Sequence, residues 1–287
     1  MAAKPIFQNI AILGVGLIGS SIGAAVAARR LASEIVGIDR DPKNLRAARQ
    51  QGAICRGTTQ LERGVSEADL VLVCTPIETI VDRVAAVAAA TEKPCLITDV
   101  GSTKARIVAA VGRNTAAVDR FVGSHPMAGN EQQGPRHADK NLFLGRSVIL
   151  TPIRNTNRTA LRRLERFWNS LGARTVTMSP AEHDRAIATV SHLPHLVAAA
   201  LVASTPDRNL AQVASGWLDT TRIASSDAEM WVHILRDNRS HILKSATRFE
   251  KVVTSMCRAL AEEDRATLCR ILQDAQAKRD SARSSDS

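Results

Sequence analysis

Short runs of branched apolar residues alternate with helical stretches from the start of the chain to about residue 179. Runs that are apolar throughout predict strands buried on both faces of a sheet, and helices between them predict a parallel, doubly wound α/β fold. The expected strands are Ile6–Leu13, Glu34–Ile38, Asp69–Cys74, Cys95–Asp99, Arg120–Gly123, Arg146–Leu150 and Arg174–Met178.

Three of the expected helices begin with recognisable capping residues. Asp41 precedes a proline, which places an oxygen at the N-cap and proline in the first turn. Thr75 and Ser179 also precede a proline, and Glu78 and Glu182 follow them three residues later. Both sequences therefore predict a capping box at the start of a helix.

The β-rich runs stop after Ser179, and apolar residues then recur at helical spacing as far as Ala277. This change predicts two domains, an α/β domain over residues 1–179 and an all-helical domain over residues 180–287. The polar, serine-rich tail from Lys278 to Ser287 is expected to be irregular.

The composition argues against several classes of protein. The net charge is +10, but Lys and Arg are scattered and aromatic residues make up only 3%, so few side chains could stack on bases. We therefore expect no nucleic-acid partner and interpret the charge as attracting anionic small molecules. The five cysteines lack paired short spacings, which argues against disulfides and zinc and fits a reducing cytoplasm.

The segment Ile10–Ala28 has no charged residue and superficially resembles a signal peptide or a membrane span. Its glycines make a poor hydrophobic span but suit a strand, a tight turn and a helix, so we expect no membrane partner. Gly14 would permit the turn, Gly16 would let a pyrophosphate approach the backbone, and Gly19 would let helix and strand pack closely.

This G-x-G-x-x-G pattern predicts a Rossmann-like dinucleotide site, although such turns also occur for packing reasons alone. The phosphates would lie at the positive N-terminus of the helix, which begins with Leu17 and Ile18. Asp39 strengthens the interpretation, because it ends the second expected strand and can accept hydrogen bonds from the adenosine ribose. A solvated turn is the alternative role for this residue.

A carboxylate at Asp39 would repel the 2′-phosphate of NADP, so we expect NAD as the cofactor, while the adjacent Arg40 leaves some use of NADP open. Thr75 and Pro76 follow another strand at the edge where ligands bind in such folds. They could line the nicotinamide, and Thr75 could equally cap the next helix.

Two further polar clusters, over residues 98–104 and 123–129, follow strands that should end at the same edge. His125 lies in the second cluster and is suited to remove a hydroxyl proton while hydride leaves the same carbon. Ser102, in the first cluster, could bridge this histidine and the substrate hydroxyl. A loop histidine satisfied by backbone carbonyls is the alternative for His125.

The sequence resembles the prephenate/arogenate dehydrogenase family, of the bacterial monofunctional type, from Ile10 to about Arg239. The residues that carry the resemblance are Asp99-Val100-Gly101-Ser102-Thr103-Lys104, Ser124-His125-Pro126-Met127-Ala128-Gly129 with Glu131 and Gly134, Ser191-His192-Leu193-Pro194-His195, and Asp219-Thr220-Thr221-Arg222. They occur in the family's order.

The resemblance implies an NAD-dependent oxidative decarboxylation of prephenate to 4-hydroxyphenylpyruvate in tyrosine biosynthesis, or of arogenate to tyrosine. It implies His125 as the catalytic base, oriented by Ser102, with His195 in contact with the substrate side chain and Arg222 binding a carboxylate. The other residues that it assigns to the substrate pocket are Ser191, Asp219 and Trp231. We expect prephenate rather than arogenate, because His195 can hydrogen-bond a keto oxygen.

The residues themselves leave alternatives open. Arg222 suits a bidentate grip on a carboxylate but could pair with a nearby aspartate, and Trp231 could belong to the core. Glu131 could be a gate, a contact between subunits or an exposed loop acid. His192 and His195 share a helix face, but no third ligand has sequence support, so we expect no metal.

Two other functions compete with this interpretation. A β-hydroxyacid-type dehydrogenase would rely on a lysine in its helical half, and a regulator would bind NAD without turnover. The long apolar faces of the helical domain exceed what one such domain can cover, and the resembled enzymes pair through it. We therefore expect a cytoplasmic homodimer, formed through the helical domain, that acts on a small molecule.

Overall fold

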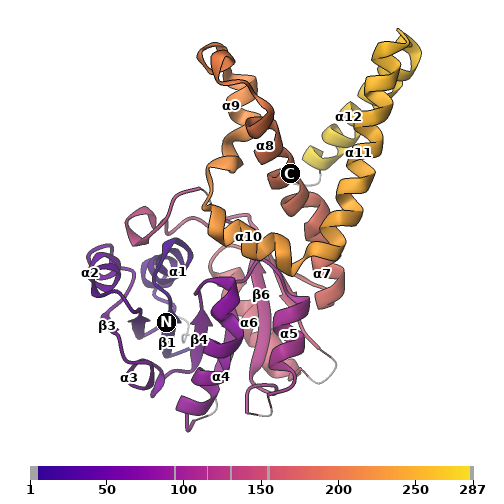
Figure 1. Ribbon diagram of the computed structural model, residues 1–287. Helices are drawn as coiled ribbons and strands as arrows, with labels where there is room; N and C mark the ends of the chain where they lie inside the picture. The colour runs from indigo at the N-terminus through magenta and orange to yellow at the C-terminus, as the bar shows by residue number, and fades with distance from the viewer. Residues whose placement is uncertain (1–5, 94, 115, 130, 154–155, 285–287) are drawn as a thin grey trace. The chain divides into compact units, whose positions relative to one another are not determined.

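The computed structural model describes residues 6–93, 95–114, 116–129, 131–153 and 156–284. Its contacts divide the chain into two units, one that ends at Asn238 and one that begins at Arg239. Figure 1 shows the sheet and its covering helices, which belong to the first unit. The predicted boundary after residue 179 follows the change from strands to helices rather than this division, and it stays a prediction.

An eight-stranded sheet lies at the centre of the first unit, in the order β3-β2-β1-β4-β5-β6-β7-β8. All the expected strands are present. Sequence reasoning missed β3, because its residues Arg-Gly-Thr form no apolar run. The strands are β1 (Asn9–Leu13), β2 (Glu34–Ile38), β3 (Arg56–Thr58), β4 (Leu70–Val73), β5 (Leu96–Asp99), β6 (Phe121–Pro126), β7 (Ser147–Thr151) and β8 (Arg174–Thr177).

Strand β7 departs from the predicted parallel order, because it runs antiparallel to β6 with His125 opposite Ile149. The described part of the connection between them contains only the short 3-10 helix η2 (Pro135–His137). A parallel return requires a longer crossover, usually a helix, whereas an antiparallel return does not. The doubly wound fold is confirmed, and the expectation of a wholly parallel sheet is wrong at this strand.

Alternate residues of each central strand serve the two faces of the sheet. Ile10 and Ile12 pack in one core with side chains of α1, α2 and α6, while Ala11 and Leu13 pack in the other with side chains of α3, α4 and α5. The helices are α1 (Leu17–Ala28), α2 (Pro42–Gln50), α3 (Leu61–Val65), α4 (Ile80–Ala90), α5 (Ala105–Val111) and α6 (Arg158–Ser170).

Two of the three predicted helix starts are confirmed. Asp41 accepts a hydrogen bond from the Lys43 amide, and Ser179 forms a capping box with Glu182. The prediction at Thr75 is wrong, because a 3-10 turn, η1 (Ile77–Thr79), precedes α4. The Thr75 hydroxyl accepts from the Thr79 hydroxyl at 2.9 Å instead of from the backbone.

After β8 the described chain is helical. The first unit continues through α7 (Pro180–Ile187), the π-helical turn η3 (Ala188–His192), α8 (Leu193–Ser204), η4 (Asp207–Gln212), α9 (Ser215–Thr221), η5 (Arg222–Ser225) and α10 (Ala228–Asp237). A π turn inside a longer helical run frequently marks a functional site.

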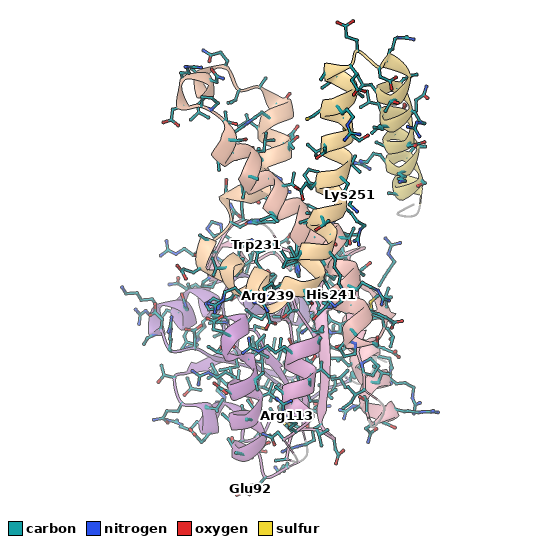
Figure 2. All side chains as sticks on the ribbon, turned by 45° about the vertical axis from the view of Figure 1, so that its right-hand side comes forward. Glu92, Arg113, Trp231, Arg239, His241 and Lys251 are labelled. Atoms are coloured by element: carbon teal, nitrogen blue, oxygen red, sulfur yellow. The ribbon has the colours of Figure 1, made fainter. Side chains whose placement is uncertain are left out.

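The second unit consists of α11 (Arg239–Ala261) and α12 (Arg265–Ser284), whose side chains are drawn in Figure 2. Both helices expose apolar side chains, including Leu243 and Phe249 on α11 and Leu272 on α12. The expectation of an irregular tail from Lys278 is wrong as far as Ser284, where the chain is still helical. A polar composition excludes a core position but leaves the backbone free to continue a helix.

Candidate active site

The glycine loop has the geometry that a dinucleotide turn requires. Gly14 has a φ of +93°, and a Cβ there would lie 2.6 Å from the Cys74 carbonyl oxygen. A Cβ on Gly19 would lie 2.1 Å from the carbonyl oxygen of Gly14, so only glycine lets α1 approach the loop so closely. At both glycines, backbone atoms already fill the space that a Cβ would take, as the predicted pattern requires.

Gly16 differs from its neighbours in facing open space. No atom lies within 4 Å of a Cβ built there, and Gly16 forms the N-cap of α1 without a side-chain hydrogen bond. Leu17 and Ile18 begin the helix, so their amides belong to its positive end. These residues fit the pyrophosphate of a dinucleotide.

Asp39 follows β2 and is tied to the glycine loop. Its Oδ2 accepts from the Val15 amide at 3.1 Å, and its Oδ1 accepts from the Asp41 amide at 2.9 Å. These contacts hold a carboxylate beside the loop, where a ribose would lie. Arg40 is exposed. Thr75 is half-buried and Pro76 is exposed just after β4, and the turn η1 that follows them contacts α10.

The loop after β6 brings the second polar cluster to the glycine loop. A Cβ on Gly129 would lie 3.7 Å from the Ile18 side chain, and the Asp139 amide donates to the Ser21 hydroxyl at 3.0 Å. Strands β1, β4, β5 and β6 are mutually parallel, so their carboxyl ends share one edge of the sheet. His125, in β6, therefore lies at the edge that carries the dinucleotide loop.

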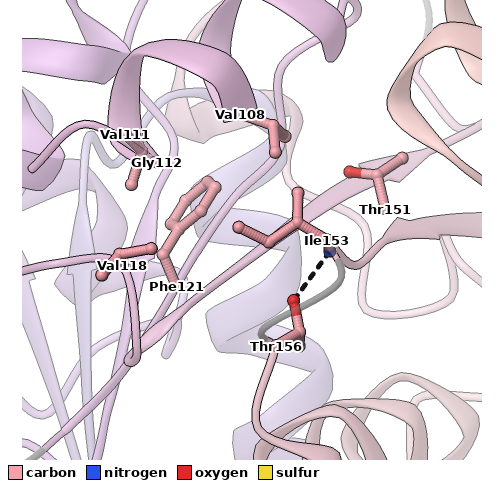
Figure 3. Close-up of a pocket in the computed structure, with 8 residues that line it drawn as sticks. All are labelled: Val108, Val111, Gly112, Val118, Phe121, Thr151, Ile153 and Thr156. Atoms are coloured by element: carbon pink, nitrogen blue, oxygen red, sulfur yellow. Dashed lines mark hydrogen bonds between the residues drawn. The ribbon is translucent and has the colours of Figure 1, made fainter.

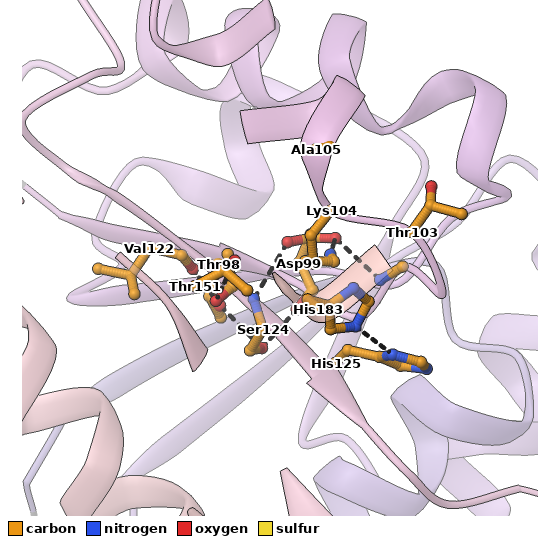
Figure 4. Close-up of polar contacts among 12 residues, drawn as sticks. Thr98, Asp99, Thr103, Lys104, Ala105, Val122, Ser124, His125, Thr151 and His183 are labelled. Carbon is orange, nitrogen blue, oxygen red and sulfur yellow. Dashed lines mark hydrogen bonds and ion pairs between the residues drawn. The ribbon is translucent and has the colours of Figure 1, made fainter. Parts of the chain in front are cut away.

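His125 is buried, and its Nδ1 lies 2.8 Å from Nε2 of His183 on α7, as Figure 4 shows. The His183 Nδ1 lies in turn 2.7 Å from Oδ1 of Asp184. Burial holds the pKa of His125 well below 6.5, and the neighbouring His183, Lys104 and His192 act in the same direction. The His125 ring is therefore neutral at neutral pH.

Sequence reasoning missed the connection of His183 and Asp184 to His125. They lie in the first turns of α7, directly after its capping box, and His183 is 58 positions from His125 in the sequence. The Asp184 carboxylate also accepts from the amides of Lys104 at 2.7 Å and Ala105 at 3.0 Å. The only feature of the sequence that could have drawn attention to His183 and Asp184 is that they stand side by side at a well-capped helix start. This feature does not predict a contact with His125.

A second ion pair joins the two ends of the loop between β5 and α5. Lys104 Nζ contacts Asp99 Oδ2, and both side chains are fully buried. Burial lowers the pKa of the lysine, while the Asp99 carboxylate opposes this change. Asp99 also accepts from the Gly101 amide at 2.8 Å, which stiffens the loop between β5 and α5.

Ser102 lies half-buried in this loop, between the anchoring residues Gly101 and Lys104. Its backbone lies near the His192 ring. No contact of Ser102 with His125 is found among the described residues, so the predicted bridge between them stays a prediction. The partner that the structure gives to His125 is His183.

His192, His195 and Trp231 form a cluster from η3, α8 and α10. The rings of His195 and Trp231 are stacked 3.5 Å apart, and the His192 ring meets Trp231 edge-on at 6.0 Å. The buried atoms His192 Nε2, His195 Nδ1 and Trp231 Nε1 have no hydrogen-bond partner within the described part of the chain. Such groups suit a polar ligand, because they are costly to leave unpaired.

Burial lowers the pKa of both histidines in this cluster, to about 4 for His192. Asn238 donates to Nδ1 of His192 at 3.1 Å and to the Asp184 carbonyl at 2.7 Å, which links the cluster to α7. Both rings are therefore neutral at neutral pH and can donate or accept hydrogen bonds.

Arg222 pairs with Glu131, whose Oε2 lies 2.7 Å from Nη1 of the arginine. The sequence alternative was a pair with Asp219 or Asp227, and the structure shows neither. Asp219 is exposed on α9, and Ser191 is half-buried in the π turn. The Arg222 side chain is 58% exposed despite this pair, so an anion can reach the guanidinium from solvent.

A shallow pocket elsewhere in the first unit, between α5, β6 and the chain after β7, is lined largely by apolar side chains (Figure 3). The Ile153 amide donates to the Thr156 hydroxyl at 2.8 Å at its rim. No cluster of three potential metal ligands occurs among the residues that the structure describes.

The glycine loop, the acid at the end of β2 and a buried histidine at the same sheet edge define a dinucleotide-dependent oxidoreductase with a helical second part. Residues 22–177 match the family described as prephenate dehydrogenase, nucleotide-binding domain, and residues 179–274 match prephenate dehydrogenase, dimerization domain. The chain therefore belongs to the prephenate dehydrogenase family.

Individual relatives agree with this assignment. The chain is 36% identical to the prephenate dehydrogenase of Bacillus subtilis over 280 residues, which cover 95% of this chain and 76% of that protein. Its structure resembles the Aquifex aeolicus prephenate dehydrogenase in complex with hydroxyphenyl propionate and NAD+, with a TM-score of 0.89, 32% identity and coverage of 98% of this chain and 100% of that one.

A Synechocystis arogenate dehydrogenase is also similar, with a TM-score of 0.79, 28% identity and coverage of 96% of this chain and 100% of that one. The predicted family and two-part fold are confirmed, and with them the class of NAD-dependent oxidoreductase.

Proposed function

We propose that this protein oxidises and decarboxylates prephenate with NAD+, forming 4-hydroxyphenylpyruvate for tyrosine biosynthesis. The observation that carries the proposal is a neutral, buried His125 at the same sheet edge as a glycine loop suited to a dinucleotide. A nicotinamide on that loop and a base at that edge are the two groups that oxidation of an alcohol requires.

His125 accepts the proton of the ring hydroxyl while hydride leaves the carbon that bears this hydroxyl. Bound NAD+ supplies the hydride acceptor. Loss of carbon dioxide then makes the ring aromatic, which provides a large driving force. The contribution of the protein is therefore alignment of the ring and removal of one proton.

Arg222 binds a carboxylate of the substrate, and Glu131 pairs with the guanidinium when no substrate is bound. The exposure of this pair supports such an exchange, because an exposed ion pair is worth at most about 1 kcal/mol. The unpaired nitrogens of His195 and Trp231 supply polar contacts to the substrate side chain. Ser102, Ser191 and Asp219 complete the pocket.

We further propose a cytoplasmic homodimer formed through the helical region. The run Pro180–Ser204 is apolar and long enough to cross a membrane, but it carries the buried polar residues His183, Asp184 and His192. A second copy of the chain would cover its exposed apolar side chains, such as Val190. Light scattering should give twice the chain mass of 30.8 kDa, and a monomer would contradict this proposal.

The test of the activity is formation of NADH by the purified protein with prephenate and, in parallel, with arogenate. We expect the higher kcat/KM with prephenate and NAD+, and a lower value with NADP+ because of Asp39. Higher efficiency with arogenate would make it an arogenate dehydrogenase. No reduction of NAD+ with either substrate would reject the proposal.

Arg222→Ala should raise the KM for prephenate by at least about tenfold, because the variant loses a charge-assisted contact to a carboxylate, while kcat changes less. Steady-state kinetics measure both values. The exposed Arg166→Ala on α6 is a matched control that should leave them unchanged. An unchanged KM in Arg222→Ala would exclude carboxylate binding at this residue.

A further inference from the structure

A chain of hydrogen bonds runs from His125 through His183 to Asp184, and Figure 4 shows its first link. The His183 side chain is fully buried and that of Asp184 is 5% exposed, so water does not compete for these bonds. The residues come from β6 and from the start of α7, which the capping box of Ser179 and Glu182 fixes. The chain is thus built on rigid elements.

Asp184 determines which nitrogen of His183 carries a proton. Burial alone would raise the pKa of this carboxyl, but hydrogen bonds from His183, Lys104 and Ala105 outweigh burial and lower it. The carboxylate is therefore ionised at neutral pH and can only accept hydrogen bonds. His183 must donate to it from Nδ1, which leaves a lone pair on Nε2 of the neutral ring.

The same reasoning fixes the tautomer of His125. Its Nδ1 lies 2.8 Å from the Nε2 lone pair of His183, so this Nδ1 must carry a proton and donate it. The lone pair of His125 is then on Nε2, the nitrogen that His183 does not engage. A base that accepts a hydroxyl proton needs a free lone pair, and the chain supplies it at Nε2.

We propose that His183 and Asp184 are positioning residues that hold His125 in this tautomer and take up the charge formed in the reaction. The inference rests on the proposed function. As Nε2 of His125 accepts the hydroxyl proton and hydride passes to NAD+, the Nδ1 proton of His125 moves to Nε2 of His183. The positive charge then lies on His183, beside the Asp184 carboxylate, which stays ionised.

The surroundings favour this final position of the charge. The ionisable groups that face the two rings are Asp184, Asp99, Lys104 and His192. Burial and Lys104 lower the pKa of His183, but both carboxylates oppose them, whereas burial, His183, Lys104 and His192 all lower the pKa of His125 with no carboxylate to oppose them. Asp184 also binds the amides of Lys104 and Ala105, so it anchors the start of α5 and the loop that carries Ser102.

Asp184→Asn tests the charge, because an amide oxygen can still accept from His183 while the negative charge is lost together with the bond from the Ala105 amide. We expect kcat for prephenate oxidation to fall at least about tenfold with KM changed by less than about threefold. The acid limb of the kcat profile should move to lower pH, since the protonated pair loses its counter-charge. The exposed Asp119→Asn is the control and should leave kcat and the limb unchanged.

The tautomer is measured separately from activity, by 15N NMR of histidine-labelled enzyme without cofactor, with His125 assigned from its loss in His125→Gln. We expect a protonated Nδ1 and an unprotonated Nε2 for His125 at pH 7.5. The opposite tautomer, or an Asp184→Asn variant with wild-type kcat and acid limb, would overturn the inference. A wild-type enzyme that fails to oxidise prephenate would instead reject the proposed function, whatever the tautomer.

Discussion

The dinucleotide loop and the His125 network lie at one edge of the same sheet, but they are built in opposite ways. The loop draws its geometry from backbone within residues 14–19, with one carboxylate added from the end of the next strand. The network joins side chains from β6 and α7 with a backbone amide from the loop after β5, across separations of up to 80 positions in the sequence. The loop is a local device that a pattern reveals, whereas the network exists only after folding.

The largest expected effect comes from the network. His125→Asn should lower kcat for prephenate oxidation by at least about a hundredfold, because no other group is placed to accept the hydroxyl proton. The KM should change little, since in the proposed function the substrate is bound by Arg222 and the cluster around Trp231. Stopped-flow measurement of NADH formation tests this effect, and a kcat within about fivefold of wild type would remove His125 from the role of base.

The same contrast explains what could be predicted from the sequence. Strands with continuous apolar runs, the glycine turn, Asp39 and the caps at Asp41 and Ser179 all depend on neighbours in the sequence, and all were predicted. The failures depend on choices that the local pattern leaves open. The described part of the connection before β7 holds only η2, so the strand returns antiparallel, and the Thr75 hydroxyl bonds the Thr79 side chain in its own turn rather than the backbone.

For the site, the pattern around His125 was sufficient to suggest a base but not to name its partner. His183 carries no local mark of function, and only folding brings its ring to His125. The partner of Arg222 was also expected among nearby aspartates, yet it is Glu131, 91 positions away. Ion pairs and hydrogen bonds across long separations depend on side-chain packing that hydrophobic periodicity does not encode.

Two glycine substitutions sharpen the account of the loop. Gly19→Ala places a Cβ against the Gly14 carbonyl, so α1 must shift, and we expect a loss of about 1–3 kcal/mol in stability together with a higher KM for NAD+. Gly16→Ala faces open space and should raise that KM without lowering stability, because its methyl group meets only the bound pyrophosphate. Urea unfolding and NAD+ titration of both variants measure the difference. Equal stability losses would contradict the assigned roles.

The buried histidines make the stability of the fold sensitive to acid. The pKa of His192 is about 4 in the folded state and 6.5 when unfolded, so the unfolded chain binds the extra proton first as pH falls. Stability is therefore complete above about pH 6.5 and declines below it, by about 2 kcal/mol at pH 5 for this residue.

Urea unfolding of wild type and His192→Gln at pH 7.5 and pH 5 measures this contribution. The variant should lose less stability than wild type on acidification, while His137→Gln, an exposed histidine on η2, should behave as wild type. Equal losses in all three proteins would show that His192 is not the group whose protonation weakens the fold.

The smallest expected effect compares two helix starts that the sequence made look alike. The Ser179 hydroxyl accepts from the Glu182 amide, and the Glu182 carboxylate accepts from the Ser179 amide. Ser179→Ala should therefore cost about 1 kcal/mol of stability. Thr75 caps no helix, and Thr75→Ala should cost less than about half of that amount. Because the capping box begins the helix that carries His183 and Asp184, Ser179→Ala should also lower kcat slightly. A Thr75→Ala variant destabilised as much as Ser179→Ala, in urea unfolding at pH 7.5, would mean that α4 depends on the cap that its sequence predicts.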